Sequence, residues 1–584
     1  MANSLFRRKT IDSILTDAEK GDTEVHAHGL KRVLTVRDLT FFGIAAIIGA
    51  GSFSSLGQAV FNGGPGVVLL FVITGIACAF TALCYSEFAS RIPVAGSAYT
   101  YAYASFGELF AWIIGWALIM EYSIGNIYVA FSWSDYFTSF LHKVNLHIPD
   151  YLTCSYAEAH KAVLSGSSNE ELINAWNSAP MLGSLRVILD LPALVINLLI
   201  TYLVFRGIKE SRNFSNVMVI LKLAIVTLVI LVGGSLILSH GLTFNWTPAN
   251  DEGVRSFMPN GFSGVMTAVA GVFFAYIGFD AVSVLAEESK NPQRDLPRGM
   301  IYSLVICTVV YILLSLVLTG AVHYKNFDGV GDPLAFIFEK QNLNIGWMQL
   351  LVSICAVVAM TSVLLVFQMG QPRIWMSMSR DGLLPSVFQK IHHKFKTPSF
   401  ATIVTGLVVG VPILFTDKTF VLDFTSIATL FAFVLVCGGV LLIPRKEKVA
   451  GRFHIPYING QFLYPLIIAL SLILFTVLSK NYFNNLFDFD YSANADYIEG
   501  KASFMDLATP NISLIIFWII CFILAIVTVI KKYSLIPLMG VTTCLYLLTG
   551  MTKDNWAWFL SWLGVGLIIY FIYGYKKSKL AVKK

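Results

Sequence analysis

The chain has 584 residues, of which 56% are apolar and only 13% are charged, and its mean hydropathy is +0.70. This composition excludes an ordinary soluble protein. Apolar stretches of about 20 residues recur along the chain, and each is long enough to cross a bilayer core. A membrane β-barrel would instead show short alternating segments. We therefore predict an all-α polytopic membrane protein.

The N-terminal residues 1–37 are polar, and they lack the apolar core and small-residue cleavage site of a secretory signal. Two interpretations of this tail stay open: an amphipathic surface helix over SLFRRKTIDSILTDAEK, or a partly ordered cytoplasmic tail. Of the 8 cysteines, only Cys154 falls in a clear loop, and no CxxC motif occurs. We expect no structural disulfide.

Fourteen membrane spans are predicted, and the longest loops between them are 132–183 and 480–510. About three quarters of the 41 lysine and arginine residues fall on the side that holds both tails, which predicts that this side is cytoplasmic. We expect a multi-pass protein of the plasma or inner cell membrane, and the formal charge of +6 then reflects topology, with no nucleic-acid partner. The predicted spans are 39–60, 64–89, 97–131, 184–205, 213–239, 261–284, 301–324, 345–371, 399–416, 419–443, 461–479, 511–531, 533–550 and 556–574.

The first span contains IIGAGSF, which places Gly49 and Gly51 at the middle of a charge-free segment. Glycine costs about 1 kcal/mol relative to alanine inside a helix, and irregular backbone survives at membrane depth only where it lines a protected cavity. The freed N–H groups of residues 49–52 would face a small volume at the positive end of the next half-helix, which suits a carboxylate. Close helix packing through small residues is the alternative.

Spans three and five each contain a notable ionisable residue. Glu121 in LIMEYSIG either relays protons or is a protonated structural acid, and Asn126 is interpreted as a polar link between helices. Lys222 in VILKLAIV is the one lysine or arginine placed away from the ends of a predicted span. Its ammonium is costly there unless it is paired or neutralised. Lys222 is therefore a candidate proton-responsive group, with snorkelling to the interface as the alternative.

Span six contains FFAYIGFDAVSVLAEESKNP, with Gly278 and Asp280 near its middle. A buried acid in a membrane helix marks a functional-site candidate, and interrupted segments in corresponding positions of two halves point to a transporter with inverted repeats. The first half-helix would expose the carbonyls of Phe274, Ala275 and Ile277, which can bind an ammonium. Amides on one broken helix and carbonyls on the other form a receptor for a zwitterion, of which a free α-amino acid is the natural example.

Four segments together resemble the APC (amino acid–polyamine–organocation) superfamily: IIGAGSF, YSEFASRIPVAGSAYTYAYASFGE, FFAYIGFDAVSVLAEESKNPQRDLPRGM and GQPRIWMSMSRDGLLP. The basic opening SLFRRKTID, the fourteen spans and the last segment are most similar to the cationic amino acid transporter branch and its bacterial relatives. The resemblance covers roughly residues 5–450. It implies a five-plus-five inverted-repeat core, like that of the leucine transporter, with broken helices 1 and 6.

This likeness also implies how the chain is divided. The expected parts are a cytoplasmic tail over 1–37, a transport core over 38–445 with repeats over about 38–240 and 260–445, additional peripheral transmembrane helices over 446–575, and a basic tail over 576–584.

Matching the family motifs places the substrate carboxylate at the amides of Ala50 and Gly51, and the substrate amino group at carbonyls of both broken helices. Family members often have isoleucine where this chain has Ser52, a departure that should alter the local pocket. The predicted substrate-binding residues are Ile47, Ile48, Gly49, Ala50, Gly51, Ser52, Phe274, Ala275, Ile277 and Met360.

The resemblance places Lys222 where sodium sits in sodium-coupled relatives, and Thr361 and Ser362 where adjacent hydroxyls bind that ion. A lysine would fill this volume and repel sodium. We therefore expect proton coupling, or exchange, with the two hydroxyls hydrogen-bonded to Lys222. Glu121 and Asp280 complete the candidate coupling residues.

Fewer sequence features bear on substrate specificity and on gating. Met360, with Phe274 and Ile48, predicts an apolar pocket for neutral amino acids, and core packing is the alternative for the methionine. The charged residues of the cytoplasmic motifs either pair across an inner gate or form a solvated surface. The gate candidates are Arg91, Glu287, Glu288, Arg373 and Asp381.

The leading hypothesis is a secondary transporter that moves L-amino acids by alternating access and is coupled to protons. An exchanger and a non-transporting amino acid sensor are the alternatives. No P-loop and no HExxH motif occurs in the sequence, so we expect no enzyme activity, no cofactor and no metal site. The expected partners are the amino acid, the proton and the lipid bilayer.

Overall fold

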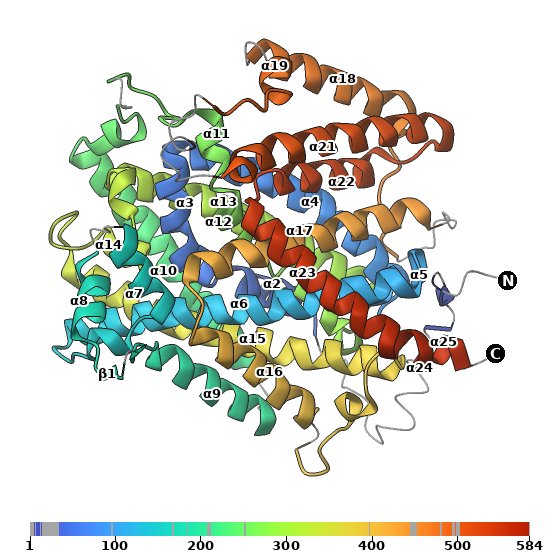
Figure 1. The fold of residues 1–584 in the computed structure, drawn as a ribbon, viewed down its shortest axis with the longest axis horizontal. Coiled ribbons are helices and arrows are strands. Elements are labelled where there is room, and N and C mark those ends of the chain that lie inside the picture. The colour runs from blue at the N-terminus through green and yellow to red at the C-terminus, as the bar shows by residue number, and fades with distance from the viewer. Residues whose placement is uncertain are drawn as a thin grey trace.

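Figure 1 shows the computed structural model of this chain as an assembly of helices with one short β-hairpin among its described residues. The described residues are 5, 7–11, 13–14, 34–94, 97–165, 169–183, 185–206, 212–249, 253–395, 397–443, 452–478, 482–492, 497 and 503–582.

Long helices form over the apolar stretches. α13 begins with Pro292, at a position where the N–H that proline lacks has no helical partner. The long helices are α4 (Val67–Arg91), α6 (Glu108–Lys143), α9 (Leu191–Arg206), α10 (Arg212–Ser239), α13 (Pro292–Ala321), α15 (Gly346–Arg380), α16 (Ser399–Ile413), α17 (Lys418–Leu442), α18 (Gly460–Leu478), α21 (Phe504–Lys531), α22 (Leu535–Leu548) and α23 (Lys553–Ile569).

Both predicted interruptions are present. The first span consists of α2 (Val36–Ile47), the π-helical segment η1 (Gly51–Ser55) and α3 (Leu56–Gly63). The sixth consists of α11 (Gly261–Met266), α12 (Val269–Phe274) and the 3₁₀ segment η5 (Asp280–Glu288).

Short elements fill the connections. They are α5 (Ser97–Ser105), α7 (Tyr156–Ser165), α8 (Glu170–Ser178), α14 (Pro333–Phe336), α19 (Tyr482–Leu486), α24 (Tyr575–Lys577), α25 (Lys579–Val582), β1 (Met181–Leu182), β2 (Leu185–Arg186), the 3₁₀ turns η2 (Gly64–Gly66), η3 (Asp150–Leu152), η4 (Leu242–Trp246), η6 (Tyr324–Phe327) and η7 (Ser386–Gln389), and the π segment η8 (Tyr570–Gly574).

Within the described residues, nine helices are long and apolar enough to cross a membrane, and three shorter apolar helices accompany them. This agrees with a polytopic all-helical protein, while the count of fourteen spans and the inverted repeat stay predictions. The bounds of the third span differ from the expected 97–131. Gly107, at φ 102°, separates α5 from α6, and α6 continues to Lys143 beyond the purely apolar stretch.

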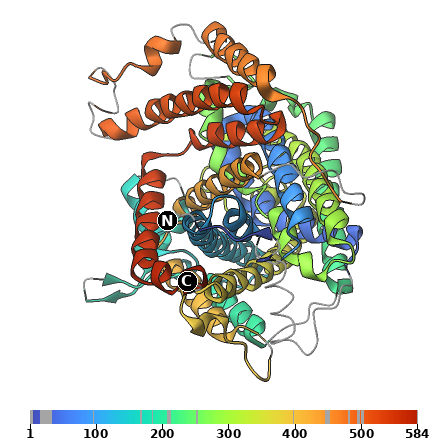
Figure 2. The ribbon, with the colours of Figure 1, turned by 90° about the vertical axis from the view of Figure 1, so that its right-hand side faces the viewer.

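Residues 7–11 and the C-terminal helices lie at one end of the molecule, and α7 and α8 lie at the opposite end (Figure 1). The end with residues 7–11 is named the tail end, and the end with the helical hairpin of α7 and α8 is named the hairpin end. α18, α21 and α22 form an outer layer in both ribbon views (Figure 1, Figure 2) and share an apolar cluster around Tyr464, Phe517 and Trp518. All eight cysteines are free and buried, Cys154 among them.

Glu108 joins the C-terminal helices to the core at the tail end. Its fully buried carboxylate accepts hydrogen bonds from the hydroxyls of Tyr103 at 3.0 Å, Tyr570 at 3.0 Å and Ser578 at 2.5 Å. The guanidinium of Arg7 lies 4.0 Å from the same carboxylate. Since a buried carboxylate is stable only when donors surround it, these contacts fix three segments of the chain around one side chain.

Replacing Glu108 with leucine should lower the midpoint of thermal unfolding in detergent. The substitution leaves three buried hydroxyls without their acceptor, and each such group costs about 1–3 kcal/mol. Tyr570→Phe removes one donor and should lower the midpoint by less. An unchanged midpoint for Glu108→Leu would show that the carboxylate does not hold these segments together.

Candidate functional site

The two interrupted helices touch each other where their backbones are irregular. A Cβ added at Gly51 would lie 2.5 Å from the Cα of Ala275, and one added at Gly278 would lie 3.0 Å from the carbonyl carbon of Ala46. Gly278 also has φ 118°, in the region that favours glycine. The glycines therefore allow the two breaks to pack directly against each other.

The backbone groups at these breaks are partly occupied by bonds within the protein. The carbonyl of Ile47 accepts the hydroxyl of Tyr311 at 2.9 Å, and that of Phe274 accepts the N–H of Ile277 at 3.2 Å. The carbonyl of Gly49 accepts both the N–H and the hydroxyl of Ser52, at 3.1 and 3.0 Å. Two carbonyls expected to bind an ammonium thus have protein partners in this conformation.

The structure places most of the predicted substrate-binding residues at this junction, and all of them are buried. Met360, on α15, is fully buried, one residue before the predicted hydroxyl pair. Gly49 faces the same helix, because a Cβ added there would lie 2.6 Å from Cγ2 of Val363. α15 therefore packs against the break of the first span.

Lys222 bridges two elements beside the breaks. The side chain is on α10 and the residue is 2% exposed, and its ammonium donates to the carbonyl of Ala45 at 3.2 Å and to the hydroxyl of Ser362 at 2.8 Å. Thr361 differs from expectation, because it accepts the indole N–H of Trp133 at 2.9 Å and donates to its own helix. Lys222 thus connects α2, just before its break, with α15.

Glu121 and Asp280 are both buried, at 4% and 2% exposure, as expected for acids inside the helix bundle. Asp280 is the first residue of η5, two positions after the positive-φ glycine of span six. The break in span six therefore sets the position of Asp280.

A polar seam joins α6 to α15, and sequence reasoning found only one of its members. Asn126 donates to Gln368 at 2.6 Å, Gln368 donates to the hydroxyl of Thr201 at 2.8 Å, and Gln371 donates to the hydroxyl of Ser123 at 2.5 Å. The glutamines carry no charge, and although Gln371 lies in the segment GQPRIWMSMSRDGLLP, nothing in the sequence indicates their partners.

The structure describes contacts for two of the tail-end gate candidates. Arg91 pairs with Glu87 of its own helix at 2.5 Å. Asp381 accepts the ammonium of Lys9 and the hydroxyl of Tyr99, both at 2.6 Å. Arg373 lies on α15, and the side chains of Glu287 and Glu288 are outside the described part of the structure.

A cavity of about 570 Å³ opens at the hairpin end. Its walls come from η1, α6, the hairpin of α7 and α8, the segment 329–339 and the start of α17. It carries more acids than bases: Asp135, Asp150, Glu158, Glu171, Asp332, Glu339 and Asp417 against Lys143, Lys161 and Lys418. The loop 132–183 that supplies many of these residues shows no motif, so this cavity was not predicted from the sequence.

Burial raises the pKa of two cavity acids that lie between α13 and α15. The pKa of Asp332 rises to about 6, although the hydroxyl of Ser139 donates to it at 2.7 Å, and the pKa of Glu339 rises to about 7 with a further contribution from the charge of Asp332. Both carboxyls therefore titrate close to neutral pH.

Gly51→Ala should lower the midpoint of thermal unfolding in detergent, because the added methyl would force apart the two breaks. Overpacking of this kind typically costs about 1–3 kcal/mol. The matched control is Gly564→Ala on α23, where an added Cβ meets nothing within 4 Å and helix propensity favours alanine. If the two variants unfold at the same temperature, the contact at Gly51 is not close.

Stability should fall as the pH rises from about 4 to about 7, partly through Asp332 and Glu339. Because their folded-state pKa values lie above the unfolded ones, the folded protein binds more protons in this window, and ionisation penalises the folded state. Asp332→Asn should flatten this slope in thermal unfolding. The control is Asp490→Asn, at a loop acid whose pKa is lowered by hydrogen bonds from Ser492, and it should leave the slope of stability against pH unchanged. Equal slopes in the parent protein and both variants would contradict the assignment.

Comparison with known proteins agrees with this architecture. The family model described as "Amino acid permease" matches residues 34–494, and the model described as "C-terminus of AA_permease" matches residues 533–578.

Three curated relatives illustrate the range of the family. The "Branched-chain amino acid permease BcaP" of Bacillus subtilis (strain 168) is 40% identical over 81% of this chain and 93% of its own length. The "Methylthioribose transporter" of the same organism is 39% identical over 78% and 89%. The "Cationic amino acid transporter 2, vacuolar" of Arabidopsis thaliana is 36% identical over 76% and 64%.

The expectation of an APC-type amino acid permease is confirmed by these matches, as is the expectation of a transporter in place of an enzyme. The chain belongs to the amino acid permease family and is a multi-pass membrane transporter.

Proposed function

We propose that this protein moves free L-amino acids across its membrane by alternating access, with the proton as coupling ion. The observation that carries the proposal is the position of Lys222, whose ammonium connects the backbone just before the first break to a hydroxyl on α15. These two hydrogen bonds depend on the protonation state of Lys222, because an ammonium is a stronger donor than a neutral amine.

The breaks form the substrate site in this proposal. The carboxylate meets the amides of Ala50 and Gly51, while the ammonium meets carbonyls of α2 and α12. Since the carbonyls of Ile47 and Phe274 already accept bonds from Tyr311 and Ile277, the substrate competes with these partners or binds to the carbonyl of Ala275. Binding thereby changes the contacts that hold the breaks closed.

The side-chain pocket favours neutral amino acids. Met360, Phe274 and Ile48 are apolar and buried beside the breaks. The relative that is 40% identical to this chain is named for branched-chain amino acids, which fits an apolar pocket. Another relative is named for methylthioribose and a third for cationic amino acids, so overall identity does not select the substrate.

Proton binding acts through helix spacing. When charged, Lys222 draws Ala45 and Ser362 together and so holds α2 against α15. When the proton leaves, both oxygens lose a charged donor, and the two helices are free to separate. Coupling follows because the same separation changes the break to which the substrate binds.

The tail end is the cytoplasmic side in this proposal, in accordance with the lysine and arginine distribution. Opening towards the cytoplasm then requires the contacts of Asp381 with Lys9 and Tyr99 to break. The remaining gate candidates, Arg91, Glu287, Glu288 and Arg373, stay proposals for the same movement. Glu121 and Asp280 stay proposals for the path of the proton.

The decisive experiment is uptake of a panel of labelled amino acids into proteoliposomes, with pH and sodium gradients imposed separately. An inward proton gradient should drive uptake of neutral amino acids, and a sodium gradient should not. Lys222→Met should abolish the response to pH, because the titrating group is gone. Lys553→Met, at a lysine on the surface of α23 that pairs with Asp506, is the matched control and should retain it.

Other outcomes identify the alternatives. Uptake that follows sodium alone would overturn the role of Lys222. Counterflow that needs internal substrate and ignores both gradients would identify an exchanger. Binding without counterflow would identify a sensor.

A further inference from the structure

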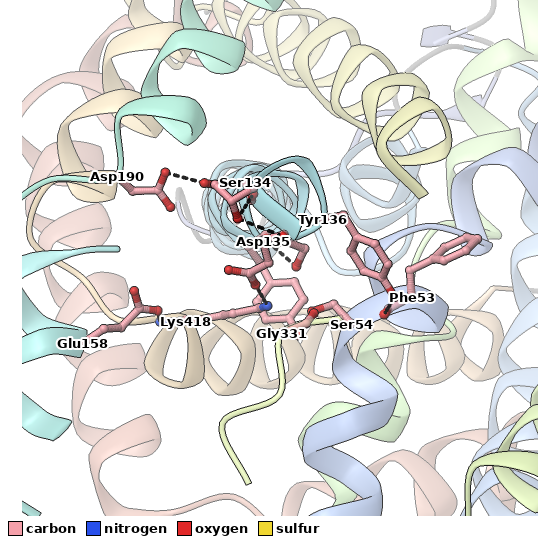
Figure 3. A network of polar contacts seen from close by, with 12 residues as sticks. Phe53, Ser54, Ser134, Asp135, Tyr136, Glu158, Asp190, Gly331 and Lys418 are labelled. Carbon is pink, nitrogen blue, oxygen red and sulfur yellow. Dashed lines mark hydrogen bonds and ion pairs between the residues drawn. The ribbon is translucent and has the colours of Figure 1, made fainter. Parts of the chain in front are cut away.

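The hairpin-end cavity borders the two breaks at one part of its lining. Ser54 belongs to η1, Tyr128 and Asp135 to α6, and Lys418 to the first turn of α17. Figure 3 shows the side chains of Ser54, Asp135 and Lys418 converging from their separate elements.

Lys418 lies at the centre of this layer. Its ammonium is hydrogen-bonded and ion-paired with Asp135, and it lies 5.6 Å from the centre of the Tyr128 ring. That ring in turn packs edge-on against Phe274, with 4.6 Å between the ring centres. Because Phe274 is the last residue of α12 before its break, only one aromatic ring separates the lysine from the break of span six.

Two further hydrogen bonds hold the break of span one against the same layer. The hydroxyl of Tyr136 donates to the carbonyl of Phe53 at 2.5 Å, and the hydroxyl of Ser54 donates to the carbonyl of Gly331 at 2.9 Å (Figure 3). The carbonyl of Phe53 and the hydroxyl of Ser54 both belong to η1. These two bonds therefore hold η1 against α6 and against the segment before α14.

The first turn of α17 is bound to α7, the first helix of the helical hairpin. The backbone N–H of Lys418 donates to Glu158 at 3.1 Å, and Lys161 pairs with Asp417 at 3.7 Å. Glu158 and Lys161 both belong to α7. The start of α17 and α7 therefore form one unit, and the pair of Lys418 with Asp135 joins this unit to α6.

The pair is suited to reversible closure. The side chains of Lys418 and Asp135 are 18% and 31% exposed. Water can therefore solvate both charges when the pair separates. Glu158 and Asp417 lie next to Lys418 in the cavity wall, so the released ammonium remains among acids. A pair that was buried on both sides would instead act as a permanent link.

We propose that the ion pair of Lys418 with Asp135 is the latch that closes the hairpin end of the transport path. When the pair forms, the first turn of α17 lies over Tyr128 and the breaks are shut off from the cavity. When it breaks, α17 and α7 move away from α6 and the cavity joins the breaks. This role rests on the proposed alternating access and on the hairpin end facing outward.

The test measures access to the breaks from outside without requiring transport. Val363→Cys, beside Gly49, serves as the reporter and is labelled in intact proteoliposomes with a membrane-impermeant maleimide, against the parent protein with its eight buried cysteines. Asp135→Asn and Lys418→Met should each raise the labelling rate, by about two- to fivefold, the shift expected from loss of one partly exposed pair. The charge swap Asp135→Lys with Lys418→Asp should return the rate towards that of the parent.

The matched control is the pair of Lys553 with Asp506, at 3.0 Å, which does not line the cavity. Lys553→Met should leave reporter labelling unchanged. Unchanged labelling in both Asp135→Asn and Lys418→Met would overturn the latch, as would an equal rise in Lys553→Met. Absent uptake by the parent protein would instead reject the proposed transport function, so the two failures are distinguishable.

Discussion

A backbone inside a membrane must satisfy its hydrogen bonds within the protein, and this constraint decides where the chain can interrupt its helices. The two interruptions occur side by side, because Gly51 has no Cβ to meet Ala275 and Gly278 has none to meet Ala46. Each break thus shields the other from lipid. Lys222, the polar seam of α6 with α15 and the hairpin-end layer are all arranged around this contact.

The local parts of this arrangement could be predicted from the sequence. Apolar runs predicted the helices, and glycines predicted both breaks, with Asp280 as a second signal in span six. The family resemblance predicted the contact of Lys222 with Ser362. The limits of the prediction are also local. α6 runs past the apolar stretch to Lys143, and Gly107 ends the preceding helix, because turn geometry and packing, which hydropathy does not register, set these bounds.

The long-range contacts could not be predicted. Asp135 and Lys418 are 283 positions apart, and Ser54 and Gly331 are 277 apart. None of these residues belongs to a motif, and a lysine in the first turn of a helix is usually solvated. Only the fold brings the start of α17 over Tyr128. Likewise Thr361 and Ser362 are adjacent in sequence, yet their hydroxyls point to different partners, Trp133 and Lys222, because successive residues on a helix face different directions.

The two lysines along this path differ in what compensates their charge. Lys222 donates to a carbonyl and a hydroxyl deep in the helix bundle, where the residue is 2% exposed. Lys418 is ion-paired with the carboxylate of Asp135, and both of these side chains are partly exposed. In the proposed mechanism Lys222 exchanges a proton, while Lys418 forms and breaks an ion pair at a position that water can reach. The two proposed roles, coupling and closure, thus match the difference in solvent access between the two positions.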